Sequence, residues 1–306
     1  LICGGGSSLL PAPPEGLDLN DLQALNEALL ASGAPISVMN DIRKCFSTIN
    51  GGRLAALAHP AQVVSLIVSD VPGDAPDEVA SGPTVLERPQ PADVLDMVAA
   101  RAIALPERCM EYLRHATPDP VPTHQRLSQT HVIASAGMSL KAAAQAAQKQ
   151  GVNAWVLSDQ IEGEARDVAL VHAALTRQAR DSAVPFPAPV VLLSGGETTV
   201  TLRHKGRGGR NSEFQLALAI ALEGEQGIHT LAADTDGIDG SEDNAGAFVD
   251  GSTIAQMRAA GVDPLKMLQD NNAYSAFEAI DALFMTGPTG TNVNDFRAIL
   301  VGDLPE

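Results

Sequence analysis

Residues 190–222 read VVLLSGGETTVTLRHKGRGGRNSEFQLALAIAL and indicate the architecture of the chain. An apolar run, Val190–Leu193, is followed by a polar, glycine-rich loop and then by an Ala/Leu-rich helical pattern over Ser212–Leu222. A second apolar run follows at Thr230–Ala232. A strand, a helix and another strand in this order are typical of a βαβ unit, in which the two strands run parallel.

The same order recurs elsewhere in the sequence. The other apolar runs are Val63–Val68, His131–Ala134 and Ala154–Leu157, and the other helical patterns are Leu19–Ser32, Ala92–Ile103 and Ser139–Gln150. A length of 306 residues corresponds to about two domains. Proline-rich stretches at Thr117–Thr123 and Pro185–Pro189 stiffen the chain between elements. We therefore predict two α/β domains with largely parallel or mixed sheets, over residues 1–122 and 123–306, and an active site in the cleft between them.

The composition excludes several classes of protein. The chain has 37 acidic against 20 basic residues and a net charge of −17, so its surface repels nucleic acids and anionic membranes. The three cysteines (Cys3, Cys45 and Cys109) are widely spaced, which argues against a disulfide framework or a cysteine zinc site. We find no signal peptide pattern and no apolar run long enough to span a bilayer. These features indicate a cytoplasmic metabolic enzyme, and a homo-oligomer is left open.

The loop Arg203–Asn211 is unusual because it gathers four basic residues in an acidic chain. It opens directly onto a helical pattern, where free N–H groups and the positive end of the helix dipole favour a phosphate or a carboxylate. A solvated hairpin turn is the alternative. The candidate anion-binding residues of this loop are Lys205, Arg207, Arg210 and Asn211, with Arg210 as the leading catalytic cation.

The segment Asp234–Asp250 contains six acidic residues and no basic one. Clustered like charges repel each other unless a cation or a basic partner is present, and oxygen ligands suit Mg²⁺ or Ca²⁺. We predict that Asp234, Asp236 and Asp239 bind a metal ion or orient an acceptor hydroxyl. The alternative is a solvated acidic loop.

Further candidate loops follow other apolar segments. Open α/β sheets bind ligands at the carboxyl ends of their strands, and glycines with serine hydroxyls suit an anion. Ordinary turns use the same residue types, so each loop alone is ambiguous. Neither a dinucleotide-binding fingerprint nor a P-loop is present. The further binding candidates are Gly5, Gly6, Ser7, Ser8, Asp70, Asp74, Gly195, Gly196, Glu197, Thr291 and Asn292.

At these loops the sequence resembles the type-2 glycerate kinases, also called the MOFRL or TtuD-like family. The similar segments run in family order over essentially the whole chain: Cys3–Leu10, Ile49–Leu54, Ser69–Asp74, Ala80–Val85, Ser194–Thr198, Gly208–Glu213, Asp234–Gly240 and Thr286–Asp295. The MOFRL-like region covers about residues 190–306. The resemblance implies a two-domain α/β enzyme that transfers the γ-phosphoryl group of ATP to the 2-hydroxyl of D-glycerate, with Mg²⁺.

Two alternatives remain open at this point. Some relatives carry the name hydroxypyruvate reductase, which implies NAD(P)H chemistry, although the missing dinucleotide fingerprint favours the kinase. Family members also have an N-terminal segment with a Gly-Lys-Ala stretch, and no counterpart precedes Cys3 in this sequence. We expect the first domain to lack that segment, so a catalytically silent fragment that binds an anion is the second alternative.

Overall fold

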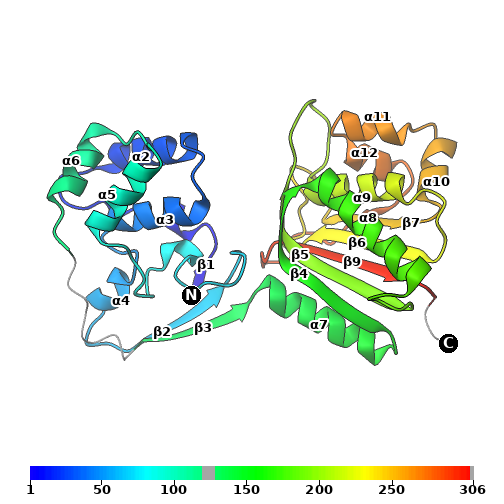
Figure 1. The fold of residues 1–306 in the computed structure, drawn as a ribbon, viewed down its shortest axis with the longest axis horizontal. Coiled ribbons are helices and arrows are strands. Elements are labelled where there is room, and N and C mark those ends of the chain that lie inside the picture. The colour runs from blue at the N-terminus through cyan, green and yellow to red at the C-terminus, as the bar shows by residue number, and fades with distance from the viewer. Residues whose placement is uncertain (119–127, 304–306) are drawn as a thin grey trace. The chain divides into compact units, whose positions relative to one another are not determined.

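The computed structural model describes residues 1–118 and 128–303, and the chain divides into two compact units, Leu1–Ile133 and Ala134–Glu306 (Figure 1). The predicted boundary between residues 122 and 123, and most of the proline-rich stretch Thr117–Thr123, lie outside the described residues. Each unit has its own β-sheet and its own buried clusters of hydrophobic side chains.

The first unit combines a small sheet with a helical core. Its three strands are ordered β1-β2-β3, and β1 runs parallel to β2. Its buried cluster joins Leu25, Ile42, Val94 and Leu113, one residue from each of the four longest helices of this unit. The elements are β1 (Ile2–Cys3), α1 (Gly6–Leu9), α2 (Leu19–Ala31), α3 (Ile36–Cys45), α4 (Arg53–Leu57), β2 (Val63–Val68), the 3₁₀ helix η1 (Val79–Ser81), α5 (Pro91–Ala100), α6 (Glu107–His115) and β3 (Ser128–Ala134).

The second unit is built on a six-stranded sheet in the order β4-β5-β9-β6-β7-β8. Helix α7 packs on one face of this sheet, while α8 and α9 cover the other (Figure 1). The elements are α7 (Ala136–Lys149), β4 (Asn153–Glu164), α8 (Ala165–Ser182), β5 (Val190–Thr199), α9 (Arg210–Ala221), β6 (Ile228–Asp234), β7 (Gly246–Asp250), α10 (Thr253–Ala259), α11 (Pro264–Gln269), α12 (Ala273–Glu278), β8 (Leu283–Phe284) and β9 (Asp295–Val301).

The strand pairing confirms the predicted mixed α/β class and refines the βαβ expectation. Strands β5 and β6 each pair antiparallel with β9, so they run parallel to each other with β9 inserted between them. The expectation fails around α7, because β3 joins the small sheet and β4 joins the large one. The apolar runs on either side of α7 therefore do not belong to one sheet.

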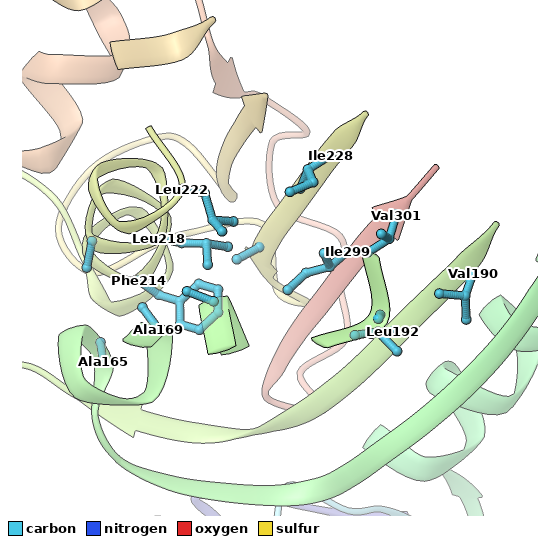
Figure 2. Close-up of a cluster of buried hydrophobic side chains, with 14 residues drawn as sticks. Ala165, Ala169, Val190, Leu192, Phe214, Leu218, Leu222, Ile228, Ile299 and Val301 are labelled. Atoms are coloured by element: carbon cyan, nitrogen blue, oxygen red, sulfur yellow. The ribbon is translucent and has the colours of Figure 1, made fainter. Parts of the chain in front are cut away.

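Helix α9 lies at the centre of the second unit. Residues 211–219 are buried on every side, because α8, α11, α12 and strands β6 and β7 all pack against this helix. Figure 2 shows Phe214 and Leu218 of α9 between the helix and the strands that hold Leu192 and Ile299. Each such side chain contributes about 1.5–3 kcal/mol to folding by leaving water. This packing fixes the position of the start of α9 relative to the sheet.

The register of β9 places two charged residues inside the protein. Side chains alternate between the two faces of a strand, so Asp295 and Arg297 share the buried face of β9 with Ile299. Gly196 of β5 lies opposite Asp295, and Ser194 lies opposite Arg297. Buried polar side chains therefore lie next to the hydrophobic core, near the carboxyl end of β5.

The remaining composition-based expectations concern covalent and membrane features. The three cysteines are free thiols in the structure. Among residues 1–118 and 128–303, no helix combines the length and the apolar character that crossing a membrane requires.

Candidate active site

The carboxyl ends of β5 and β6 bring Arg210 together with three carboxylates. Arg210, the first residue of α9, donates from Nε to Asp295 Oδ1 (2.6 Å), from Nη2 to Asp234 Oδ2 (2.7 Å) and from Nη1 to Glu197 Oε1 (3.2 Å). Burial opposes the charge of this guanidinium, but Asp295, Asp234 and Glu197 together outweigh that effect and the pKa of Arg210 is raised. The structure thus joins the predicted cation to two predicted residues, Asp234 and Glu197.

Asp295 organises this cluster, although it was not among the predicted site residues. Its side chain is fully buried and accepts hydrogen bonds from Arg210, from Asn211 Nδ2 (2.8 Å) and from Thr198, through the backbone N–H (3.1 Å) and the hydroxyl (3.2 Å). Arg297 also forms an ion pair with it. A carboxylate held by this many donors fixes the orientation of Arg210. The only sequence signal for it was its place at the end of the Thr286–Asp295 segment.

A second buried cation lies behind Asp295. Arg297 is fully buried, donates to the Thr198 hydroxyl (3.0 Å) and lies over the ring of Phe214, with 5.1 Å between its guanidinium carbon and the ring centroid. Within the described residues, Nε and Nη1 of Arg297 have no hydrogen-bond partner. Arg297 therefore compensates the charge of Asp295 from the interior, while Arg210 does so from the side of a cavity within the second unit.

His172 of α8 is buried beside this cluster. Its Nδ1 lies 2.9 Å from the carbonyl of Val168, so Nδ1 carries the proton and Nε2 accepts from the Ser194 hydroxyl (2.9 Å). Burial lowers the pKa of His172 to about 4. The imidazole is therefore neutral near pH 7 and supports the packing of Phe214, whose ring it meets edge-on.

Asp234 and Asp236 lie together at the carboxyl end of β6. Burial of its carboxylate raises the pKa of Asp234 to about 7, although the contact with Arg210 works in the opposite direction. The backbone N–H of Asp236 donates to Asp234 Oδ1 (3.2 Å), and Asn292 Nδ2 approaches Asp236 Oδ2 at 3.5 Å. Thr235 connects this turn to the loop before β9, since its hydroxyl donates to the carbonyl of Asn294 (2.7 Å). Predicted residues Asp234, Asp236 and Asn292 are thus neighbours.

The predicted metal group of Asp234, Asp236 and Asp239 does not form. Asp239 is fully buried, and its two carboxylate oxygens accept the backbone N–H groups of Asn211 (2.9 Å) and Ser212 (2.7 Å). Both oxygens are therefore used to cap α9, whose first N–H groups have no partners within the helix. Among the described residues, no three His, Cys, Asp or Glu side chains are grouped so that they could hold a metal ion.

Replacement of Asp239 by asparagine is expected to destabilise the protein by about 2 kcal/mol. An amide has one acceptor oxygen, so the N–H of either Asn211 or Ser212 would face an NH₂ group. The free energy of unfolding in urea measures the effect. The matched control is Asp243→Asn, an exposed carboxylate of the same segment, for which we expect a change below about 0.5 kcal/mol. Equal losses for the two variants would contradict the capping role.

The basic loop, Arg203–Asn211, is held in place by hydrogen bonds and ion pairs. Asn271 accepts the backbone N–H groups of Arg203 (2.8 Å) and His204 (3.3 Å), and its amide donates to the buried Glu213 (2.9 Å). Arg207 pairs with Glu242 and Glu278. Lys205 is exposed, and no described residue pairs with its ammonium group. Arg207 is thus held by other acids, whereas Lys205 is available to a ligand.

A cavity of about 830 Å³ adjoins these groups and lies within the second unit. This volume falls within the range of about 300–1,000 Å³ that is usual for small-molecule sites. Glu197 and Arg210 line the cavity, together with backbone from the basic loop. Predicted residues Gly195 and Gly196 are part of β5 itself, and a Cβ atom at Gly196 would lie 2.3 Å from the backbone of Ile161. These glycines allow close strand packing, and their predicted role in binding an anion stays a prediction.

The remaining predicted residues lie in loops of either unit or in the short helix α1. Thr291 is exposed in the loop before β9. In the first unit, Gly5 precedes α1, which contains Gly6, Ser7 and Ser8, and the Ser8 hydroxyl donates to the Gly5 carbonyl (2.8 Å). Asp70 packs directly on Gly4, where a Cβ atom would lie 1.6 Å from Asp70 Oδ2, and burial raises the pKa of Asp70. Asp74 occupies a left-handed turn with φ of 56°. The binding roles of these residues stay predictions.

Comparisons with known proteins identify the family. A domain of unknown function (DUF4147) matches residues 1–114, and the MOFRL family matches residues 190–295. The chain is 40% identical to a D-glycerate 2-kinase of Thermotoga maritima, over 96% of this chain and 70% of the relative. It is 51% identical to an Agrobacterium vitis protein provisionally named a hydroxypyruvate reductase, over 99% of this chain and 79% of the relative.

Solved structures indicate the same family as the sequence relatives. The crystal structure of glycerate kinase from Thermotoga maritima matches with a TM-score of 0.89 and 39% identity, covering 98% of this chain and 72% of that one. A Pyrococcus horikoshii protein of known structure matches with a TM-score of 0.82 and 36% identity, covering 99% of this chain and 70% of that one. The predicted resemblance is thereby confirmed. The chain belongs to the glycerate kinase family that contains the MOFRL domain.

Proposed function

We propose that this protein is a glycerate 2-kinase, which transfers the γ-phosphoryl group of ATP to the 2-hydroxyl of D-glycerate. The observation that carries the proposal is the cluster of Arg210 with Asp234 at the edge of a large cavity, in a chain that belongs to the glycerate kinase family. Phosphoryl transfer depends on positioning and on neutralising oxygen charge, and it requires no covalent partner in the protein.

In the proposed reaction the 2-hydroxyl oxygen forms a bond to the γ-phosphorus while the bond to the β–γ bridging oxygen breaks. Arg210 neutralises charge on the transferred group, and Lys205 adds a mobile cation at the entrance of the basic loop. The hydroxyl proton passes to the carboxylate of Asp234, whose pKa of about 7 is suited to a general base. The products are 2-phosphoglycerate, ADP and that proton.

Magnesium fits this site only as an ion that arrives with the nucleotide. Protein-bound Mg²⁺ usually keeps several waters and takes one or two carboxylates besides the phosphates of the substrate. Asp236 supplies one such carboxylate, whereas Asp234 is the proposed base and Asp239 is used as a helix cap. When bound, the ion would neutralise charge on the phosphate oxygens.

The name carried by the Agrobacterium relative makes a hydroxypyruvate reductase the second candidate. A dehydrogenase of the dinucleotide-binding type is expected to present a G-x-G-x-x-G turn between its first strand and helix. Here the third glycine position is Leu9, and helix α1 has only four residues. These features favour the kinase.

Paired assays of the full-length protein separate the two activities. We expect ADP to form from ATP and Mg²⁺ only when D-glycerate is present, and we expect no oxidation of NADH or NADPH with hydroxypyruvate. Cofactor oxidation without glycerate-dependent ADP formation would establish the reductase instead.

The titration of Asp234 predicts opposite pH trends for stability and for activity. Its pKa is about 7 in the folded protein against an ordinary value of 3.8, so its stabilising contribution is complete below about pH 4 and is lost as the pH rises through about 7. As a general base it must be ionised, so kcat/KM should rise over the same interval. Urea unfolding and steady-state kinetics at about pH 5 and about pH 8 measure both trends. Asp234→Asn should lose less stability than the wild type between these pH values, and equal losses would contradict the assignment.

A further inference from the structure

The carboxamide of Asn271, between α11 and α12, makes every hydrogen bond that it can make. Its Oδ1 accepts the backbone N–H groups of Arg203 (2.8 Å) and His204 (3.3 Å), at the start of the basic loop. Its Nδ2 donates to the carbonyl of Thr201 (3.3 Å) and to Oε2 of Glu213 (2.9 Å). A carboxamide has two acceptor and two donor positions, so all of them are used here. Because Asn271 is also 5% exposed, its orientation is fixed.

The backbone of Asn271 adopts a conformation that glycine adopts more readily. Asn271 follows the C-terminal end of α11 with a φ of 53°, in the left-handed region. Glycine is the usual residue at such a helix end, and asparagine is a less frequent one. Non-glycine residues persist in this conformation where their surroundings impose it, often at functional sites. The hydrogen bonds of the side chain therefore give a physical reason for asparagine at this position.

Glu213 holds the donor side of the Asn271 carboxamide. Glu213 is 2% exposed, and its Oε1 accepts from Nε (2.9 Å) and Nη2 (2.7 Å) of Arg166. Its Oε2 accepts from Asn271 instead, so the two carboxylate oxygens have separate donors. Glu213 lies in the first turn of α9, the helix that begins with Arg210. Asn271 therefore connects the start of the basic loop to the helix that carries the proposed catalytic cation.

The middle of the basic loop packs on the residues that follow Asn271. Asn272 Oδ1 accepts the N–H of Arg207 (3.0 Å), and the carbonyl of Arg207 accepts the N–H of Tyr274 (3.0 Å). A Cβ atom at Gly206 would lie 2.3 Å from the carbonyl oxygen of Asn271, so the loop backbone lies directly on this turn. Glycines of the loop line the cavity of about 830 Å³. The position of the loop thus sets the shape of one wall of that cavity.

We propose that Asn271 is a positioning residue, which holds the basic loop and its Lys205 in the place that phosphoryl transfer requires. The role in phosphoryl transfer rests on the proposed function, whereas the anchoring of the loop does not. The hydrogen bonds of the Asn271 carboxamide all go to the protein, so it acts on the reaction through the loop. Arg210 keeps its own carboxylate contacts without Asn271, so loss of the anchor should weaken the activity and not abolish it.

Limited proteolysis of the full-length protein tests the anchoring without any activity. Asn271→Gly removes the carboxamide and suits the left-handed backbone, so we expect a folded protein whose loop is released. The loop contains Arg203, Lys205 and Arg207, after which trypsin cleaves once the backbone opens locally. We expect the rate of cleavage at these sites to rise at least about tenfold, as for the loss of one or two hydrogen bonds. An unchanged rate would overturn the anchoring role.

The matched control for this variant is Asp281→Gly. Asp281 is exposed and has a φ of 55°, so the same substitution relaxes the same backbone conformation away from the basic loop. Within the described residues its carboxylate has no hydrogen bond or ion pair to lose. We expect both the rate of cleavage in the loop and the kinetic constants to equal those of the wild type. A rate raised as much as in Asn271→Gly would show that the turn, and not the carboxamide, controls the loop.

Steady-state kinetics test the positioning role itself. We expect kcat of Asn271→Gly to fall about 10–100-fold, because small misplacements of groups around a reaction have effects of this size. The KM for D-glycerate should change by less than about threefold, because the loop acts on the transferred phosphoryl group. Urea unfolding gives the folded fraction, and a merely structural role would leave kcat per folded molecule unchanged. A wild-type kcat in a folded variant with a released loop would contradict the proposal.

A pair of substitutions that conserves charge provides a rescue test. Asn271→Asp keeps an acceptor for the loop but places a carboxylate oxygen against Glu213, so the loop should again be released. Adding Glu213→Gln restores the total charge, and the new amide can donate to residue 271 in the reverse direction. We expect the double variant to return to within about threefold of the wild type in cleavage rate and in kcat. A double variant no better than Asn271→Asp would show that this contact does not position the loop.

The two readouts separate this proposal from the proposed function. If the wild type forms no phosphoglycerate while Asn271→Gly still releases the loop, the kinase proposal fails and the anchoring role stands. Kinase activity in the wild type, with cleavage rate and kcat unchanged in Asn271→Gly, would overturn the positioning role and leave the kinase intact.

Discussion

Replacing Arg210 with methionine is expected to lower kcat/KM for glycerate phosphorylation by about 10³–10⁵-fold. Arg210 is the cation that holds together the carboxyl ends of β5 and β6 and the strand β9, which lies between them. Its side chain lines the cavity and is 23% exposed. Methionine fills similar space but cannot neutralise charge on a phosphoryl group. A coupled assay of ADP formation measures the loss.

The control for this prediction is Arg258→Met. Arg258 is an exposed arginine of the same unit that pairs with Glu223, so the same chemical change there should alter kcat/KM by less than about twofold. The folded fraction of both variants must be checked by urea unfolding, because Arg210→Met also removes the guanidinium that contacts Asp234 and Glu197. A folded Arg210→Met protein with near wild-type activity would exclude Arg210 from catalysis.

The second large effect is expected from Asp295→Asn, which should destabilise the protein by about 3–5 kcal/mol. The side chain of Asp295 is fully buried between Arg210 and Arg297, and no other described carboxylate pairs with Arg297. The substitution would therefore leave a buried guanidinium uncompensated, in a position where two of its nitrogens already have no hydrogen-bond partner among the described residues. The free energy of unfolding in urea measures the loss.

A double-mutant cycle tests whether the loss comes from the buried pair. Combining Asp295→Asn with Arg297→Met removes both charges, so the double variant should be less destabilised than the sum of the two single variants by about 2 kcal/mol or more. Glu223→Gln, in an exposed ion pair, should cost less than about 1 kcal/mol. Strict additivity in the cycle would show that Arg297 does not compensate Asp295.

The local patterns of the sequence predicted much of the second unit. The apolar run Val190–Leu193 and the helical pattern Ser212–Leu222 correspond to β5 and α9, because each follows from short-range periodicity. The insertion of β9 between β5 and β6 was not predictable in this way. It depends on the pairing of β9 with β5, about a hundred residues away, and with β6, roughly 60–75 residues away, and none of these segments carries a local signal for its partner.

Local sequence patterns also failed to predict the roles of single residues in the site. The basic loop predicted that Arg210 would meet an anion, but its main partner, Asp295, lies 85 residues away in the sequence. The acidic segment predicted one metal group, whereas the structure uses Asp239 as a helix cap and holds Asp234 against Arg210. Charge counting identifies a cluster, but burial and hydrogen bonding decide what each carboxylate does.

The most direct test of the proposed activity is a ³¹P NMR spectrum of the full-length protein with ATP, Mg²⁺ and D-glycerate. We predict that the γ-phosphate signal of ATP is replaced by a phosphomonoester signal split into a doublet, because the phosphorus of 2-phosphoglycerate couples to the single proton on C2. A triplet would identify transfer to the 3-hydroxyl and contradict the proposed regiochemistry. A spectrum that keeps its ATP signals unchanged would contradict the kinase.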